Sequence, residues 1–124
     1  MYIQNKFWDL PSSTTITKQI AKHIPTNSPI LADHRLWFSA PNNPFISLVR
    51  LSETDLRSYQ NTSLPYPHLY LLIPTYFYSG ISQPNLYSKS QQLKELTRKK
   101  GTLKATIKTP YHDTLTIWEL RDPL

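Results

Sequence analysis

The stretch TLKATIKTPYHDTLTIWEL, residues 102–120, is built of two strand-like runs separated by a turn. TLKATIKT at 102–109 and TLTIWEL at 114–120 are rich in β-branched and apolar residues, and PYHD between them favours a turn. Side chains alternate across a strand, so Leu115, Ile117 and Glu119 point to one face of the second run. The stretch predicts a hairpin that closes a sheet, with a carboxylate on an apolar strand face.

The segment at 12–29 predicts the first helix. Ile16, Ile20 and Ile24 recur at every fourth position, which is the stripe of an amphipathic helix. Hydroxyl residues before the stripe are candidates for the N-terminal cap. Because the residue before a proline disfavours the helical conformation, Pro25 is expected to end the helix.

The middle of the chain predicts further strands and a second helix. In order, we expect a hairpin around PNNP (30–51), a polar segment (52–67), a strand (68–73) and a long tyrosine-rich loop (74–85). A helix is expected over 88–101, where Ser88 and Gln91 match a capping box and Leu93 and Leu96 form an apolar edge.

These elements together predict one α+β domain spanning residues 1–124. We expect an antiparallel sheet of about five strands with two or so short helices on one face. A chain of 124 residues is long enough for a single core. It has no cysteine, which excludes disulfides, thiolate catalysis and cysteine zinc sites. Since no apolar run is long enough for a signal peptide or a membrane span, the protein is expected to be cytoplasmic and away from the membrane.

The charge balance favours an anionic partner. Fourteen Lys and Arg residues against eight Asp and Glu residues give a formal net charge of +6. Tyrosines interleaved with basic residues at 76–90, together with Lys104 and Lys108 on one face of a strand, are typical of a nucleic-acid-binding module. Exposed tyrosines also suit a protein-interaction module. Charge alone leaves both open, and the oligomeric state as well.

Motifs with strict spacing are absent from the sequence. It contains no phosphate-binding glycine loop, no GxSxG and no HExxH. The four histidines (His23, His34, His68 and His112) are far apart along the chain, so no metal site is predicted. No cofactor is expected.

The candidate site consists of three charged residues placed among apolar ones in predicted strands. They are Glu119, Arg35 and Arg50. Arginine offers a rigid fork of donors that matches a carboxylate, so two arginines beside a buried acid would hold a small dicarboxylate. The alternative is that Glu119 forms a structural ion pair, either with one of these arginines or with Arg121 at the solvent edge.

Three segments in this order resemble the chorismate lyases, which release pyruvate from chorismate to leave 4-hydroxybenzoate. They are FWDLPSSTTITKQI (7–20), RLWFSAPNNPFISLVRL (35–51) and TLTIWELRDPL (114–124). The resemblance implies that Arg35 and Glu119 are catalytic. Arg35 would clamp a carboxylate of a small anionic aromatic substrate, Glu119 would contact the ring hydroxyl end, and Arg50 would help bind. A strand and loop of the family are missing before DHRLWF, so a degenerate relative that binds an aromatic carboxylate without turnover fits as well.

Overall fold

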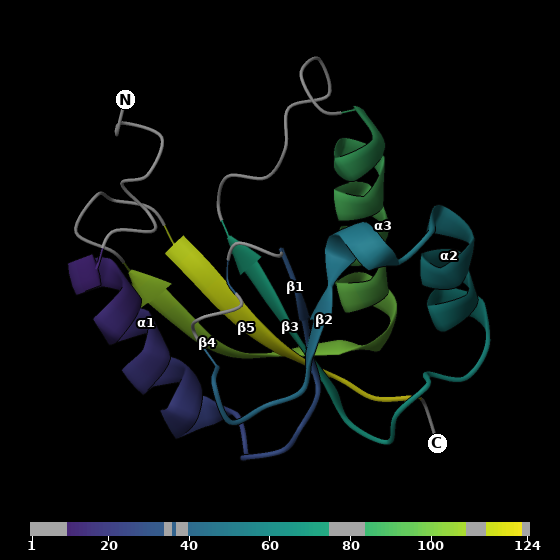
Figure 1. Cartoon of the computed structure of the whole chain (residues 1–124). Coiled ribbons are helices and arrows are strands. Elements are labelled where there is room, and N and C mark those ends of the chain that lie inside the picture. The colour runs from purple at the N-terminus through teal and green to yellow at the C-terminus, as the bar shows by residue number, and fades with distance from the viewer. Residues whose placement is uncertain (1–9, 34–35, 37–39, 75–83, 109–113, 123–124) are drawn as a thin grey trace.

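The computed structural model describes residues 10–33, 36, 40–74, 84–108 and 114–122 (Figure 1). The elements in chain order are α1 (Leu10–His23), β1 (Ile30–Ala32), β2 (Phe45–Ser47), the 3-10 helix η3 (Leu48–Arg50), α2 (Glu53–Asn61), β3 (Leu69–Pro74), α3 (Pro84–Lys100), β4 (Gly101–Lys108) and β5 (Thr114–Leu120). The five strands form one sheet in the order β2-β1-β3-β5-β4. The predicted α+β class is therefore confirmed.

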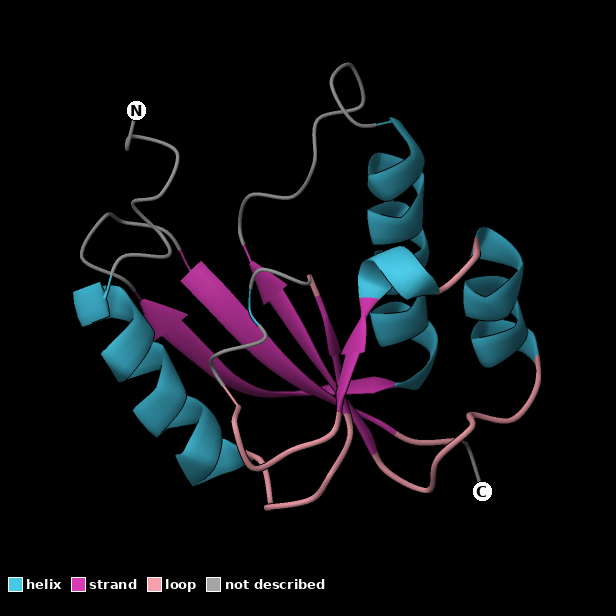
Figure 2. Ribbon diagram, viewed as in Figure 1, coloured by secondary structure: helices cyan, strands magenta, loops and turns pink. Residues whose placement is uncertain are grey.

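Helices cover both faces of the sheet, not the single face that the sequence predicted (Figure 2). α1 packs on one face over one apolar cluster, and α2 and α3 pack together on the other face over a second apolar cluster. The reason lies in β3, where four consecutive residues from Leu69 to Leu72 are buried. A strand with apolar side chains on both faces needs cover on both, because either face would otherwise stay exposed to water.

The first helix is confirmed. Ile16, Ile20 and Ile24 are 0%, 1% and 2% exposed and pack against the sheet. α1 ends at His23, two residues before Pro25, as the sequence predicted.

The hairpin predicted over 30–51 is wrong, because β1 and β2 run parallel. PNNP does form a turn, but Asn43 ties it back to the loop before β1: its side-chain amide donates to the carbonyls of Pro25 at 2.8 Å and Ser28 at 2.9 Å. Asn27, at a φ of 72°, donates its backbone N–H to the Asn42 carbonyl at 3.1 Å. The chain thus returns to the start of β1 before β2 begins. β1 is parallel to β3 as well, and the sheet is mixed.

The segment 52–67, predicted only as polar, contains α2. Ser52 caps this helix, with its hydroxyl accepting from the Asp55 N–H at 3.0 Å and the Asp55 carboxylate accepting from the Ser52 N–H at 3.0 Å. Leu56 is its one fully buried residue. A single apolar anchor gives no periodicity, and the sequence analysis did not use the capping box, so the helix was not predicted.

The helix predicted over 88–101 is present but begins earlier, at Pro84. Ser88 therefore lies inside the helix, and the predicted capping box does not form at its start. Leu93 and Leu96 are fully buried, as expected. α3 passes into β4 at Gly101 with no loop between them.

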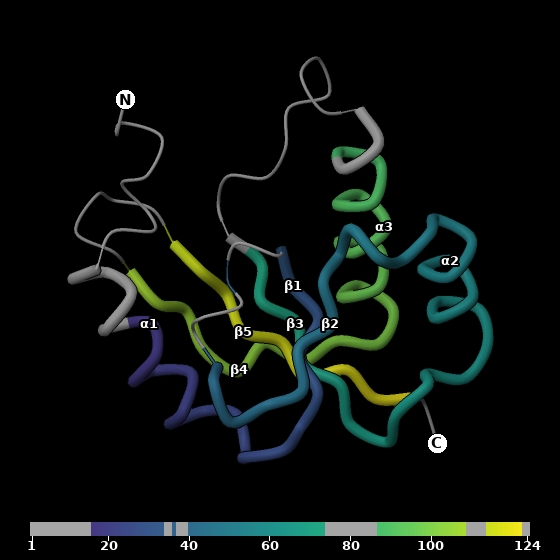
Figure 3. The backbone as a smooth tube through the Cα atoms, in the orientation of Figure 1, coloured from purple at the N-terminus to yellow at the C-terminus, as the bar shows by residue number. Residues whose placement is uncertain are grey.

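The closing hairpin is confirmed. β4 and β5 pair antiparallel from Gly101 opposite Leu120 to Lys108 opposite Thr114, as the tube in Figure 3 traces. A bulge between Leu103 and Ala105 interrupts the register. β5 also pairs antiparallel with β3, which places it inside the sheet, while β4 forms the edge.

Candidate functional site

Glu119 lies on the face of the sheet that α1 covers. Side chains alternate along β5, so Glu119 shares this face with the core residues Leu115 and Ile117. It is 8% exposed and stands opposite Tyr70 of β3 and Thr102 of β4. The carboxylate is thus placed where the apolar core ends near the end of the strand.

Three basic groups surround the Glu119 carboxylate. His68 Nδ1 lies 2.9 Å from Oε2, Arg121 Nε lies 3.2 Å from the same oxygen, and Lys104 Nζ lies 3.6 Å from Oε1. The three partners are themselves well exposed, with 47%, 65% and 41% of their side-chain surface accessible. Both carboxylate oxygens are therefore engaged, and the single negative charge faces the positive charges of Arg121 and Lys104 as well as the His68 imidazole.

The bulge in β4 is what brings Lys104 to this cluster. Lys104 is the extra residue between the pairs Leu103 with Trp118 and Ala105 with Ile117. Lys108 stands opposite Thr114 and therefore lies on the other face of the sheet. The expectation that Lys104 and Lys108 share one face is wrong, because a regular strand was assumed.

The pKa of Glu119 is lowered below its ordinary value. Burial raises this pKa, but the hydrogen bonds from His68 and Arg121 and the charges of Arg121 and Lys104 outweigh burial. The carboxylate is accordingly ionised at neutral pH. Burial raises the pKa of the Tyr70 hydroxyl, which lies opposite Glu119, and the negative charge of Glu119 raises it further.

Arg50 and Glu119 do not lie together. Arg50 ends η3, directly after β2, and is exposed. β1 and β3 separate β2 from β5, and Glu119 is opposite Tyr70 near the start of β3, whereas Arg50 follows the carboxyl end of the parallel strands. Arg35 lies outside the described residues. Of the interpretations of Glu119, direct contact with the exposed Arg121 supports the structural ion pair.

Sequence reasoning missed His68 and Lys104 as partners of Glu119. His68 is two residues before Tyr70, so strand alternation places both on the α1 face, and this signal was available. Lys104 had no such signal, because a bulge is not visible in the residue pattern.

A second charged cluster holds the residues after β5. Lys100, with 7% of its side chain exposed, donates to the Thr62 carbonyl and to Asp122 Oδ1, the latter at 2.7 Å. The Asp122 carboxylate also accepts from the Leu64 N–H at 3.0 Å. The hydrogen bonds from Lys100 and Leu64 lower the pKa of Asp122, which is therefore a fixed anion joining the end of β5 to the chain after α2.

Glu119 lines neither of two cavities found in the described part of the chain. One, of about 60 Å³, lies between α1 and the PNNP turn. The other, of about 430 Å³, is an open polar hollow beside the Lys100 cluster, lined by Gln60, Asn61, Thr62, Ser63, Lys100 and Asp122. Neither cavity pairs the predicted acid with a predicted arginine.

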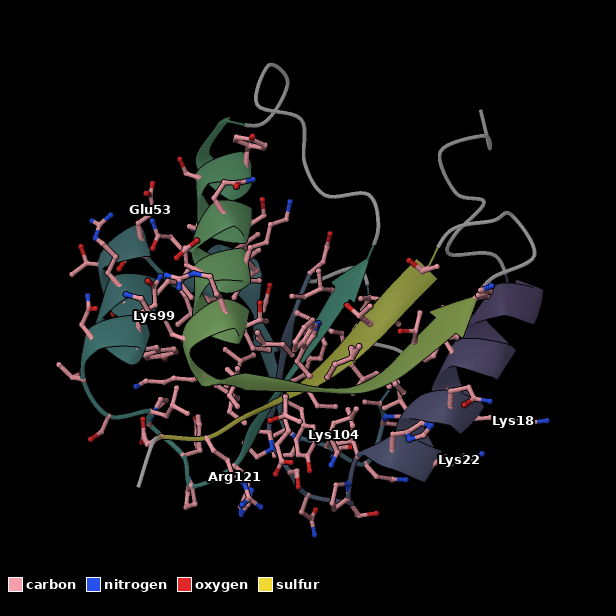
Figure 4. The ribbon with its side chains drawn as sticks, turned by 180° about the vertical axis from the view of Figure 1, so that it is seen from behind. Lys18, Lys22, Glu53, Lys99, Lys104 and Arg121 are labelled. Carbon is pink, nitrogen blue, oxygen red and sulfur yellow. The ribbon has the colours of Figure 1, made fainter. Side chains whose placement is uncertain are left out.

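Basic side chains from three elements line one edge of the molecule in Figure 4, and we call them the basic margin: Lys18 and Lys22 of α1, Lys104 of β4 and Arg121 after β5. The elements α1, β4 and β5 together contain four lysines and a single carboxylate, Glu119. On the other face, α2 and α3 carry six basic residues and three acids, and two of these acids pair within their own helix, Glu53 with Arg57 and Glu95 with Arg98. Basic residues therefore outnumber acids four to one in the basic margin with Glu119, but only two to one on α2 and α3.

Comparison with known proteins gives no match to a family model, to a curated protein or to a solved structure. Among the residues described, no three His, Asp or Glu side chains gather as a metal site would require. None of the helices described has the length and apolar character to cross a membrane. Inference about function therefore starts from the charge distribution and the sheet.

Replacing Glu119 by glutamine is expected to lower the free energy of unfolding by about 1 kcal/mol at neutral pH. The figure is modest because water screens the exposed partners of the carboxylate. Because folding lowers the pKa of Glu119, its ionised carboxylate stabilises the folded protein above the ordinary pKa of 4.5. This stabilisation is lost as the pH falls through the pKa that Glu119 has in the folded protein. Urea unfolding at a series of pH values should show wild type and Glu119→Gln converging in acid. A difference that persists unchanged in acid would contradict the ion-pair role.

Proposed function

We propose that this protein is a binding module that recognises an acidic partner protein through the basic margin. The observation that carries the proposal is the set of four basic residues in the basic margin against one carboxylate, Glu119. That carboxylate is already shared by His68, Arg121 and Lys104, so it leaves the surrounding positive charge uncompensated. A partner that brings carboxylates to this edge gains complementary charge and is steered toward it.

The placement of aromatic side chains favours a protein over a single-stranded nucleic acid. Nucleic-acid modules of this kind stack bases on aromatic rings within the basic groove. The exposed tyrosines of the described part are Tyr66 and Tyr87, and neither lies on α1, β4 or β5. The basic margin, as far as it is described, therefore offers charge without an aromatic stacking surface.

A binding experiment with two anionic probes tests the proposal. The probes are a blocked peptide of about ten residues that alternates glutamate with valine, and a single-stranded oligonucleotide of about six nucleotides, which carries about the same charge. We expect the peptide to bind in fluorescence anisotropy and the double variant Lys22→Ala, Lys104→Ala to weaken this binding about tenfold. The matched control is Arg57→Ala, Lys99→Ala, which removes the same charge from α2 and α3 and is expected to change binding less than about twofold.

The other outcomes of this binding experiment would contradict the proposal. Failure of the peptide to bind, or equal weakening by both double variants, removes the acidic partner from consideration. Tighter binding of the oligonucleotide, falling steeply between about 50 mM and 200 mM salt, would favour the nucleic-acid module instead.

The chorismate lyase hypothesis stays a prediction that depends on Arg35 and Glu119. Adding chorismate and 4-hydroxybenzoate separately, and measuring pyruvate and the melting temperature of wild type and Glu119→Ala, tests it directly. Pyruvate release that Glu119→Ala abolishes would replace the binding module by an enzyme. No pyruvate and no thermal shift would leave the ion pair as the role of Glu119.

A further inference from the structure

β4 is the long edge of the sheet. It spans eight residues and pairs with β5 on one side only within the described part of the chain, whereas the opposite edge strand, β2, has three residues. Figure 4 shows β4 in front of β5, with α1 and α3 towards its two ends. An edge strand directs half of its backbone N–H and C=O groups outward, where another extended chain can pair with them.

The side chains of β4 are consistent with an uncovered edge. Thr102, Leu103, Lys104, Thr106 and Lys108 are all exposed. Leu103 has 48% of its surface accessible and is the one strongly exposed large apolar residue that lies on a described strand. It stands opposite Trp118 of β5, which is only partly buried. The edge thus combines open backbone groups with a small apolar surface.

We propose that the β4 edge accepts an extended acidic segment of a partner protein as a sixth strand. This inference rests on the proposed function and names the way in which the partner binds. Lys104 and Lys108 point to opposite faces of the sheet, so a strand added at this edge meets a lysine on each of its faces. A strand that alternates acidic and apolar residues can place its carboxylates on the face of Lys104 and its apolar side chains beside Leu103 on the other face.

The same lysines argue against a second copy of this chain as the added strand. Two β4 edges brought together would place two sets of lysines along one seam, and like charges on adjacent strands destabilise pairing. Edge lysines and a bulge are devices that hinder indiscriminate strand pairing. A partner with carboxylates at these positions escapes the penalty, so charge selects among possible strands.

N-methylated peptides test strand addition separately from charge recognition. We take the alternating glutamate and valine peptide and methylate the backbone nitrogens at odd positions in one version and at even positions in another. In an added strand only alternate amides face β4, so one version should lose binding by about tenfold or more and the other by less than about threefold. Charge and composition are identical in the two versions.

A pair of protein variants checks that the peptide lies at β4. Leu103→Asp places a carboxylate at the edge and is expected to weaken binding about tenfold. The matched control is Val49→Asp on η3, where the replaced residue is 44% exposed, and it is expected to have less than about a twofold effect. Equal effects of the two variants would overturn the assignment to β4.

The outcomes separate the two proposals. If the unmethylated peptide binds through the basic margin but the two methylated versions bind equally, strand addition is wrong and the proposed function stands. If the unmethylated peptide does not bind, the proposed function itself fails.

Discussion

Replacing Gly101 by alanine is expected to lower the free energy of unfolding by about 2–3 kcal/mol, which is roughly a 10 °C fall in melting temperature for a chain of this size. A Cβ at this position would lie 2.7 Å from the Thr97 carbonyl oxygen and 2.8 Å from the Thr97 Cα. Both are backbone atoms of α3, so relief requires the helix or the strand to move. Because α3 joins β4 here without a loop, any movement is passed directly to the sheet edge.

Urea unfolding followed by circular dichroism measures this effect. The matched control is Thr102→Ala, one residue further along β4, where the side chain is exposed and its loss should cost less than about 0.5 kcal/mol. If Gly101→Ala costs no more than Thr102→Ala, the helix and strand do not approach as closely as described.

The second large effect is expected from Leu71 and Leu72, adjacent residues of β3 that are both 0% exposed. Leu71 belongs to the cluster beneath α2 and α3, and Leu72 to the cluster beneath α1. Truncating either to alanine removes buried methyl groups and leaves a cavity, at a cost of about 3–4 kcal/mol. β3 is central to the sheet, so both faces should lose stability together.

This pair also tests the prediction of a single domain. Leu71→Ala and Leu72→Ala are each expected to shift one cooperative unfolding transition, seen equally by far-ultraviolet circular dichroism and tryptophan fluorescence. Leu103→Ala, on the exposed edge, serves as the control and should cost less than about 1 kcal/mol. Two separate transitions, of which each variant shifted only one, would show that the layers on the two faces unfold independently.

The sequence predicted the elements whose signal is local. The isoleucine stripe of α1 and the paired runs of β4 and β5 are complete within short segments, and both are present as expected. α2 was not predicted, because Leu56 is its one fully buried residue and gives no apolar periodicity. Ser52 and Asp55 did match a capping box.

Orientation could not be predicted because it depends on contacts between distant residues. PNNP suggested a hairpin, and only the bonds from Asn43 to Pro25 and Ser28 turn the chain back so that β1 and β2 become parallel. The placement of helices on both faces follows from which strand becomes central, which no single segment specifies.

The candidate site shows the same limit. Glu119 was identified from its apolar neighbours, and the alternative that paired it with Arg121 agrees with the observed contact. Arg50 was grouped with it because it was expected among apolar residues in a strand of the same sheet, yet it lies in η3 and two strands separate β2 from β5. Lys104 reaches the carboxylate only through a bulge, and a bulge leaves no mark in an alternating pattern.

The insertion of β5 between β3 and β4 has a consequence for the order of folding. β3, whose residues LYLLI at 69–73 carry no charge, finds its antiparallel partner only in the last strand described. Closing such a distant pair is slow, because chain entropy is lost before the contacts form. Until β5 arrives, an intermediate exposes the apolar edge of β3 to other unfinished chains, and strand edges of this kind initiate aggregation. The yield of refolded monomer should therefore fall as protein concentration rises, even where the finished fold is stable.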